Sequence, residues 1–390
     1  MTGDPVVRIA ARGDGVTASG RHIAFGVPGD VLLDDGALAP GPHHQEPPCR
    51  HFPECGGCQL QHVDDEAYRG YLTSRVEGAL AQHGLTTDLR APHLSPPNSR
   101  RRASLRALRT AQGAVIGFNA AKSHRIVDMR ENFIMRPELL VLVDPLRQLM
   151  LDVLPPKRTA EVQLTLADQG VDVLLKGVSA AKLDEVECLT SFASDHGVAR
   201  LSADQGLGAE TLYEPQTITI TLSGAAVAFP TGSFLQATQD GEAALVDTVR
   251  EALGSEGAVA DLFAGLGTFA LAVGAAYAAE ASRDAAASLK AAAPGTAVEH
   301  RDLYRRPLDR AELARFEAVI LDPPRAGAEE QVRELAASAV RRIAYVSCNP
   351  ATFARDAKTL VAGGYRLEWV RPVGQFRWST HVELAACFSR

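Results

Sequence analysis

From about Pro230 to its end, the chain alternates short β-prone apolar runs with helical stretches, and this alternation limits the fold more than any other feature. The runs GAVADLF, AAYAAEAS, FEAVILD and RRIAYVS are apolar enough to be strands buried on both faces. Helical stretches such as GEAALVDTVREAL and ATFARDAKTLVAGG lie between or before them. This alternation predicts a doubly wound parallel sheet. Ligands bind such sheets outside the carboxyl ends of the strands, so the residues that follow each strand are candidates for chemistry.

A glycine-rich loop, DLFAGLGTFA, follows the first of these strands. Gly265, Gly267 and Ala270 form the pattern G-x-G-x-x-A, in which glycines let the backbone approach a ligand closely and open a helix. Glu280 ends the second strand, where its carboxylate can accept hydrogen bonds from ribose hydroxyls. It follows Gly265 by 15 residues, fewer than the roughly 20 of the dinucleotide fingerprint. Taken alone, the loop also fits a nicotinamide enzyme or a pair of packing glycines.

Two later strands end in polar residues that suit catalysis. Asp322 is followed by Pro323 and Pro324, which stiffen the turn and present the carboxylate at the mouth of the sheet. Cys348 occupies the matching position one strand further along, before an Asn-Pro pair. A cysteine within a strand is usually a small buried hydrophobe. At the carboxyl edge of the strand, Cys348 is instead placed to be an accessible nucleophile.

Three of the six cysteines lie within ten residues, in the segment CRHFPECGGCQLQH. They are Cys49, Cys55 and Cys58. The two glycines between the last two cysteines let the backbone turn tightly, so several sulfur atoms can surround one centre. Both an iron–sulfur cluster and zinc accept sulfur ligands, and His51 or His62 is a candidate to complete a zinc site.

The remainder of the chain divides into two further segments. Residues 1–46 alternate short β-rich pieces with glycine turns, which predicts a small antiparallel barrel. Residues 47–229 combine a helical pattern near 62–92 with later β-prone runs such as AEVQLTLA and VDVLLKG, which predicts a mixed α+β domain. The doubly wound sheet then covers 230–390, and we expect the helical part near 62–92 to pack on it.

Charge is distributed unevenly along the chain. The net charge of −7 argues against a protein that coats nucleic acid, yet residues 98–130 carry eight lysines and arginines against one acid. Such a segment is either a face that binds a polyanion or a solvated surface. The N-terminus lacks the apolar core of a signal peptide, and the longest uncharged run, 263–279, is interrupted by three glycines. We therefore expect a cytoplasmic protein without a membrane segment.

Several motifs in a fixed order resemble those of the bacterial RNA uracil-C5 methyltransferases, which use S-adenosylmethionine. The motifs are GSFLQATQ, DLFAGLGTFA, DPPRAG, SCNPATFARD and a terminal HVE. The N-terminal segment is similar to a truncated TRAM barrel, and the cysteine spacing resembles the iron–sulfur motif of the ribosomal RNA members. The resemblance covers nearly the whole chain. It implies a Rossmann-like methyltransferase fold and formation of 5-methyluridine, in 23S ribosomal RNA rather than transfer RNA, and we expect a monomer.

The resemblance also implies roles for individual residues. Cys348 is the nucleophile and Glu383 the base. The implied S-adenosylmethionine pocket contains Gln236, Phe263, Gly265, Gly267, Thr268, Glu280, Asp302 and Asp322. The residues expected to bind RNA are Arg100, Arg101, Arg102 and Arg325. Cys49, Cys55 and Cys58 are the implied ligands of a 4Fe-4S cluster, with Asn132 standing where the relatives place a fourth cysteine.

Three other classes of protein compete with this interpretation. A nicotinamide oxidoreductase explains the glycine loop but leaves Cys348 and the DPPR motif without a role. A methyltransferase acting on adenine amino groups has an aromatic residue after its Pro-Pro pair, and Arg325 stands there instead. A non-catalytic iron–sulfur protein that binds RNA is distinguished by its failure to transfer a labelled methyl group.

Overall fold

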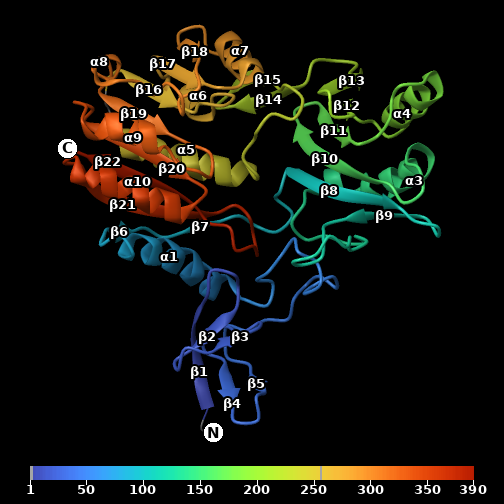
Figure 1. Ribbon diagram of the computed structural model, residues 1–390, viewed down its shortest axis with the longest axis horizontal. Coiled ribbons are helices and arrows are strands. Elements are labelled where there is room, and N and C mark those ends of the chain that lie inside the picture. Colours follow the sequence, from blue (N-terminus) through green and yellow to red (C-terminus); the bar gives the residue numbers. More distant parts are fainter. Residues whose placement is uncertain (1–2, 255–256) are drawn as a thin grey trace.

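The computed structural model describes residues 3–254 and 257–390, so residues 1, 2, 255 and 256 of the predicted domains lie outside the described residues. The described chain forms four sheets, and Figure 1 shows the N-terminal sheet below, the central sheet to one side and the C-terminal sheet to the other. Within the described residues, no helix combines the length and the apolar character needed to cross a membrane.

The N-terminal sheet has five antiparallel strands in the order β3-β2-β1-β4-β5. The strands are β1 (Gly3–Ile9), β2 (Gly15–Thr17), β3 (His22–Ile23), β4 (Val31–Leu33) and β5 (Leu38–Ala39). Gly13 has a φ of +96°, a conformation that suits glycine, and this allows the tight turn between β1 and β2. The antiparallel arrangement predicted from the glycine turns is confirmed, and the described strands form a half-barrel that ends at β3 and β5 in place of the expected barrel.

The central sheet has six strands in the order β13-β12-β11-β10-β8-β9. The strands are β8 (Arg102–Arg109), β9 (Ala114–Gly117), β10 (Thr159–Ala167), β11 (Gly170–Lys176), β12 (Arg200–Asp204) and β13 (Ala209–Tyr213). The helices with them are α2 (Pro137–Leu140), α3 (Val143–Val153) and α4 (Leu183–Asp195). In β8, Ala103, Leu105 and Ala107 are buried while Ser104 and Arg106 are exposed. This alternation places one face of β8 in the core and presents the other to solvent.

The C-terminal sheet has the order β18-β17-β16-β19-β20-β22-β21-β6, with β7 also paired to β21. Its main strands are β16 (Val259–Leu262), β17 (Tyr277–Glu280), β18 (Ala297–His300), β19 (Ala318–Leu321), β20 (Arg342–Ser347), β21 (Arg366–Gly374) and β22 (Glu383–Ser389). Strands β16 to β20 are parallel, and β22 runs antiparallel between β20 and β21. The parallel strands therefore end at one edge.

Helices and two earlier segments of the chain surround this sheet. The helices after the central domain are α5 (Gln239–Leu253), α6 (Thr268–Val273), α7 (Arg283–Ala292), α8 (Arg310–Leu313), α9 (Glu329–Ala336) and α10 (Pro350–Ala362). Helix α1 (Asp65–Ala81) packs on α10 and β21, and β6 (Asp88–Leu89) and β7 (His93–Leu94) extend the sheet edge. The hairpin of β14 (Thr219–Leu222) and β15 (Ala225–Ala228) packs on α7. Segments far apart in sequence thus pack around one sheet, as Figure 1 shows.

Candidate functional site

A cavity of about 700 Å³ lies at the carboxyl ends of the parallel strands of the C-terminal sheet. Ten residues singled out in the sequence line it: Gln236, Phe263, Gly265, Thr268, Glu280, Asp302, Asp322, Arg325, Cys348 and Glu383. They come from seven separate segments between residues 236 and 383. All of the predicted cofactor and catalytic residues except Gly267 are thereby brought to one site.

The glycine loop contributes to the cavity through one of its two glycines. Gly265 has a φ of +56°, and its N–H donates a hydrogen bond to the Glu280 carboxylate at 2.8 Å. Gly267 does not line the cavity. A Cβ atom on Gly267 would lie 2.2 Å from Leu289 Cδ1, so this glycine allows α6 and α7 to pack closely. Gly267 therefore allows close packing of the helices. The prediction that it binds the cofactor is not supported by its position.

Three acidic side chains lie close together at the cavity, with Asp322 and Glu383 in its lining and Asp261 buried nearby. Asp322 follows β19, Glu383 begins β22, and Asp261 lies within β16. Burial raises the pKa of Asp322 to about 7, and burial together with the Asp322 carboxyl raises the pKa of Glu383 to about 8. Burial, and then Asp322, raise the pKa of Asp261 well above its usual value. A cation in the cavity would favour the ionised forms of these acids, so the site suits a positively charged ligand.

Cys348 stands at the end of β20, one residue beyond the strand. Burial raises the pKa of its thiol to about 11, and the carboxyls of Glu383 and Asp322 act in the same direction. The Arg325 guanidinium lowers that pKa. The Cys348 thiol is therefore protonated at neutral pH. A reaction that uses its thiolate needs a further positive charge or a proton acceptor nearby.

Aromatic rings that the sequence analysis did not single out lie at the opening of this cavity. Phe234, Tyr304 and Phe376 line it, and the Phe234 side chain is 63% exposed. The Arg102 guanidinium lies 5.7 Å from the Phe234 ring, and the Arg100 guanidinium lies 5.2 Å from the Phe376 ring. Exposed rings beside guanidinium groups can stack on unpaired bases. Isolated aromatic residues in loops have no periodicity, so no sequence pattern identified them.

Arg101 differs from the arginines on either side of it. Its side chain is buried, donates to the Glu242 carboxylate at 2.6 Å, and donates to the Gln236 carbonyl oxygen at 3.1 Å. A buried, paired guanidinium is not available to a phosphate group. The prediction that Arg101 contacts RNA is therefore not supported by its position, and the residue instead anchors the segment that carries Gln236.

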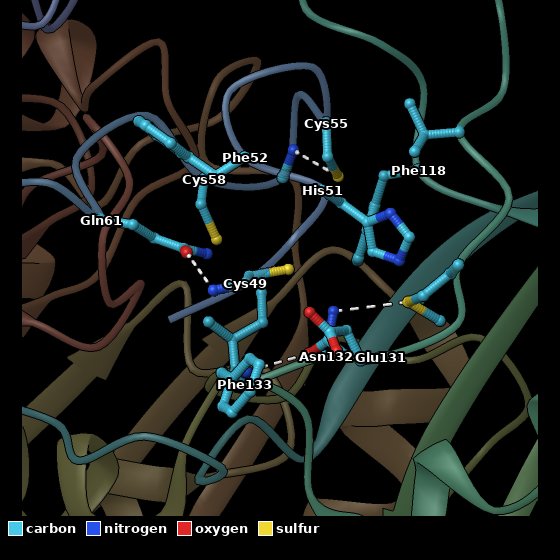
Figure 2. A pocket seen from close by; sticks show the side chains of 14 residues that line it. Cys49, His51, Phe52, Cys55, Cys58, Gln61, Phe118, Glu131, Asn132 and Phe133 are labelled. Atoms are coloured by element: carbon cyan, nitrogen blue, oxygen red, sulfur yellow. Dashed lines mark hydrogen bonds between the residues drawn. The ribbon is translucent and has the colours of Figure 1, made fainter. Parts of the chain in front are cut away.

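The three clustered cysteines line a second and much smaller cavity, of about 20 Å³, in the central domain. Figure 2 shows the sulfur atoms of Cys49, Cys55 and Cys58 around the same space, with Asn132 beside it. Burial raises the pKa of all three thiols, and that of Cys58 to about 11. The three protonated thiols thus line a cavity whose volume is roughly that needed for one water molecule.

Asn132 is held firmly in the wall of the cysteine cavity. Its Oδ1 accepts hydrogen bonds from the N–H groups of Ile134 at 2.9 Å and Met135 at 2.8 Å. Its Nδ2 donates to the Met129 sulfur at 3.4 Å. The Asn132 amide therefore stabilises the loop in which it lies. A neutral amide is also a poor ligand for iron, which prefers thiolates in such clusters.

Neither candidate histidine completes a metal site with these cysteines. His51 lines the cysteine cavity, but its Nε2 accepts a hydrogen bond from the Arg130 N–H at 3.0 Å. His62 lies outside the lining of that cavity and packs against the rings of Phe25 and Phe52. Among the described residues, no group of three or more Cys, His, Asp or Glu side chains is arranged to hold a metal ion. The residues present therefore do not fit a centre with four protein ligands.

The open sheet with its cavity at the strand ends confirms the predicted Rossmann-like methyltransferase fold. The structure of the tRNA (uracil-54, C5)-methyltransferase of Pyrococcus abyssi in complex with S-adenosyl-L-homocysteine matches it with a TM-score of 0.76. That match is 21% identical in sequence and covers 99% of each chain. At this identity, the likeness shows the fold.

Sequence comparisons identify the family. Residues 295–390 match the family model described as tRNA (Uracil-5-)-methyltransferase. A protein of Zymomonas mobilis described as an uncharacterized RNA methyltransferase is 50% identical over 393 residues, covering 99% of each chain. The 23S rRNA (uracil-C5)-methyltransferase RlmD of Photorhabdus laumondii is 31% identical over 90% of this chain and 84% of its own. The chain belongs to the family of RNA uracil-C5 methyltransferases.

Proposed function

We propose that this protein transfers a methyl group from S-adenosylmethionine to C5 of a uridine in 23S ribosomal RNA. The observation that carries the proposal is the meeting of a cysteine, a buried acid and a glycine-loop cofactor site in one cavity. The RlmD relative supports ribosomal RNA as the substrate, because its similarity extends over most of both chains. The transfer RNA enzyme of Pyrococcus abyssi supports the fold alone, and transfer RNA remains the alternative substrate.

The residues of the large cavity fit S-adenosylmethionine. Glu280 lies at the end of β17, where its carboxylate can bind ribose hydroxyls. Phe263 and Tyr304 have ring centroids 5.6 Å apart and offer apolar surface for a purine. The buried acids match the positive charge of a sulfonium group. When bound, the cofactor would supply an electrophilic methyl group in the cavity that Cys348 also lines.

The proposed chemistry begins with Cys348, because C5 of uracil is itself a poor nucleophile. The thiolate adds to C6, and the electrons of the C5–C6 double bond move to form an enolate. C5 of the enolate then takes the methyl group, and the bond between that methyl group and sulfur breaks with its electron pair staying on sulfur, so that S-adenosylhomocysteine leaves. Arg325 favours the thiolate form, and the positive charge of the bound cofactor acts in the same direction.

Glu383 completes the proposed reaction. Its carboxylate removes the proton from C5, the C5–C6 double bond forms again, and the bond between C6 and Cys348 breaks with the electron pair returning to sulfur. Glu383 is 5% exposed, so a base in this position is shielded from bulk water. Detection of 5-methyluridine in RNA treated with the purified protein and S-adenosylmethionine tests the proposed function.

We further propose that a groove beside the cysteine loop holds the RNA strand that flanks the target uridine. This groove has a volume of about 670 Å³ and is lined by Arg12, Arg106 and Lys122 from three different segments. Thr380 also lines it and directly precedes His381, which lines the catalytic cavity. The groove therefore lies next to the site of reaction.

Replacing Arg106 and Lys122 with alanine should weaken RNA binding and reduce the slope of log affinity against log salt by about 2, because each phosphate contact releases counterions. Both side chains are exposed, so neither change should reduce stability greatly. Filter binding at several salt concentrations measures the effect, and Lys290→Ala with Lys358→Ala on α7 and α10 is the matched control. Equal salt slopes for the two double variants would show that the groove does not bind RNA.

We propose that the cysteine cavity does not hold a complete 4Fe-4S cluster in this chain. Asn132→Cys should raise iron and sulfide content and the absorbance of the sulfur-to-iron bands, because it offers a fourth thiolate in the cavity wall. Iron analysis and absorption spectra of aerobic and anaerobic preparations measure this. The control variant Asn132→Ala removes the amide without adding sulfur. Four irons and four sulfides in the anaerobic unaltered protein, with no change in Asn132→Cys, would contradict the proposal.

A further inference from the structure

Gln375 lies close to the reaction site but does not line the cavity. Both the nitrogen and the oxygen of its side-chain amide take part in hydrogen bonds. It follows β21 directly and is 1% exposed. Its Nε2 donates one hydrogen bond to Gln236 Oε1 at 2.7 Å and another to the Glu383 carboxylate. Its Oε1 accepts from the Ala237 N–H at 2.9 Å. One amide therefore joins the proposed base to the segment that carries a proposed cofactor residue.

The first turn of α5 packs closely against the Gln375 side chain. A Cβ atom on Gly241 would lie 2.7 Å from Gln375 Cβ and 3.3 Å from its Oε1, so the first turn of α5 approaches this side chain closely. On the other side, Arg101 donates to the carbonyl oxygens of Gln236 and Ala237. Hydrogen bonds from the buried Arg101 and to Gln375 thus hold Gln236 and Ala237, which precede α5.

From these contacts we infer that Gln375 is a positioning residue, which orients the Glu383 carboxylate toward C5 of the uracil and holds Gln236 against the cofactor. This inference rests on the proposed function. The glutamine touches neither substrate nor cofactor, and it acts through the two side chains that its amide joins. Because one N–H is given to Gln236, only one remains for Glu383, and this fixes which carboxylate oxygen is left free to take a proton.

Loss of this amide should slow one step more than the others. Removal of the C5 proton needs Glu383 ionised and correctly aimed, whereas addition of Cys348 and arrival of the methyl group do not. The Gln375 N–H stabilises the ionised carboxylate and lowers the pKa of Glu383. Burial of Glu383 opposes this effect, and so does the carboxyl of Asp322, after β19. Cys348, after β20, also faces Glu383, but its sulfur carries no titratable proton while it is bonded to C6. Without the donor, the methylated adduct should need a higher pH to break down.

The test uses the full chain with a uridine-containing RNA and S-adenosylmethionine. In Gln375→Met, which keeps the length of the side chain and removes the amide, breakdown of the protein–RNA adduct at pH 7.5 should slow by about tenfold or more. The pH midpoint of breakdown should rise, while the rate of adduct formation should change less than about threefold. Gly241→Ala removes no polar group, but its Cβ atom would lie 2.7 Å from both Gln375 Cβ and the Thr238 Oγ1 that caps α5. In a folded protein it should displace Gln375 and give the same pattern.

Gln331→Met is the matched control, because Gln331 is also 1% exposed and its amide is bonded to Leu308, away from the cavity. This variant should lose stability without a change in the pH midpoint. If Gln375→Met and Gly241→Ala leave the pH midpoint and adduct lifetime unchanged, or slow adduct formation equally, the inference is wrong. If the unaltered protein makes neither adduct nor 5-methyluridine with any RNA, the proposed function itself fails.

Discussion

Replacing Cys348 with alanine should abolish methylation of uridine, with activity falling by about four orders of magnitude or more, while affinity for the cofactor stays within about twofold. The thiol is the only atom group lost, and the residue stands at the end of β20 without a role in the core. Cofactor binding depends on other residues of the cavity, including Glu280 and Asp322. Transfer of a labelled methyl group and calorimetry with S-adenosylhomocysteine measure the two properties.

Cys188→Ala provides the matched control for this experiment. Cys188 lies in α4 of the central domain and packs against its hydrophobic core. Its loss should leave methyl transfer within about twofold. Methyl transfer by Cys348→Ala at a rate comparable with that of the control would mean that the enzyme does not use this thiol.

In the Glu383→Gln variant, Cys348 should still add to uracil and the methyl group should still be transferred. The variant should then accumulate as a covalent complex with RNA. The amide cannot accept the C5 proton, so turnover should fall by about 10²- to 10⁴-fold, the usual contribution of a general base. The complex should survive denaturing gel electrophoresis, because a C–S bond joins protein and RNA.

The side chain that replaces Glu383 remains close to Gln375, so the cavity should keep its shape. The double variant Cys348→Ala with Glu383→Gln is the control and should give no complex. A complex of equal yield in that double variant would show that another residue attacks the base. Rapid turnover by Glu383→Gln would show that another group removes the proton.

The arrangement of strand ends explains why so much of the candidate site was predictable. Parallel strands bring their carboxyl ends to one edge, so Glu280, Asp322 and Cys348 had to lie near one another once the alternation of strands and helices was recognised. The family resemblance added Gln236 and Glu383, which stand outside the parallel strands. The structure places all five on one cavity.

Other features depended on long-range packing that no local pattern shows. Arg101 lies in a basic segment, and only its partner Glu242, 141 residues later, makes it a buried structural residue. Gln375 carries no motif, because its importance comes from bonds to Gln236 and Glu383. The contribution of β6 to the C-terminal sheet also joins residues far apart in sequence, because Asp88 pairs with Trp369. Strand β6 has only two residues, which is too short for the alternating pattern that identifies a strand in a sequence.

The most direct test of this account is the position of 5-methyluridine after reaction of the purified protein with S-adenosylmethionine and either 23S ribosomal RNA or transfer RNA. Both RNAs should come from cells that lack the enzyme, and mass spectrometry of nuclease fragments identifies the methylated base. We expect 5-methyluridine in the ribosomal RNA, and none in either RNA with Cys348→Ala. Methylation of transfer RNA alone would contradict the proposed substrate, and methylation at any atom other than uracil C5 would contradict the proposed chemistry.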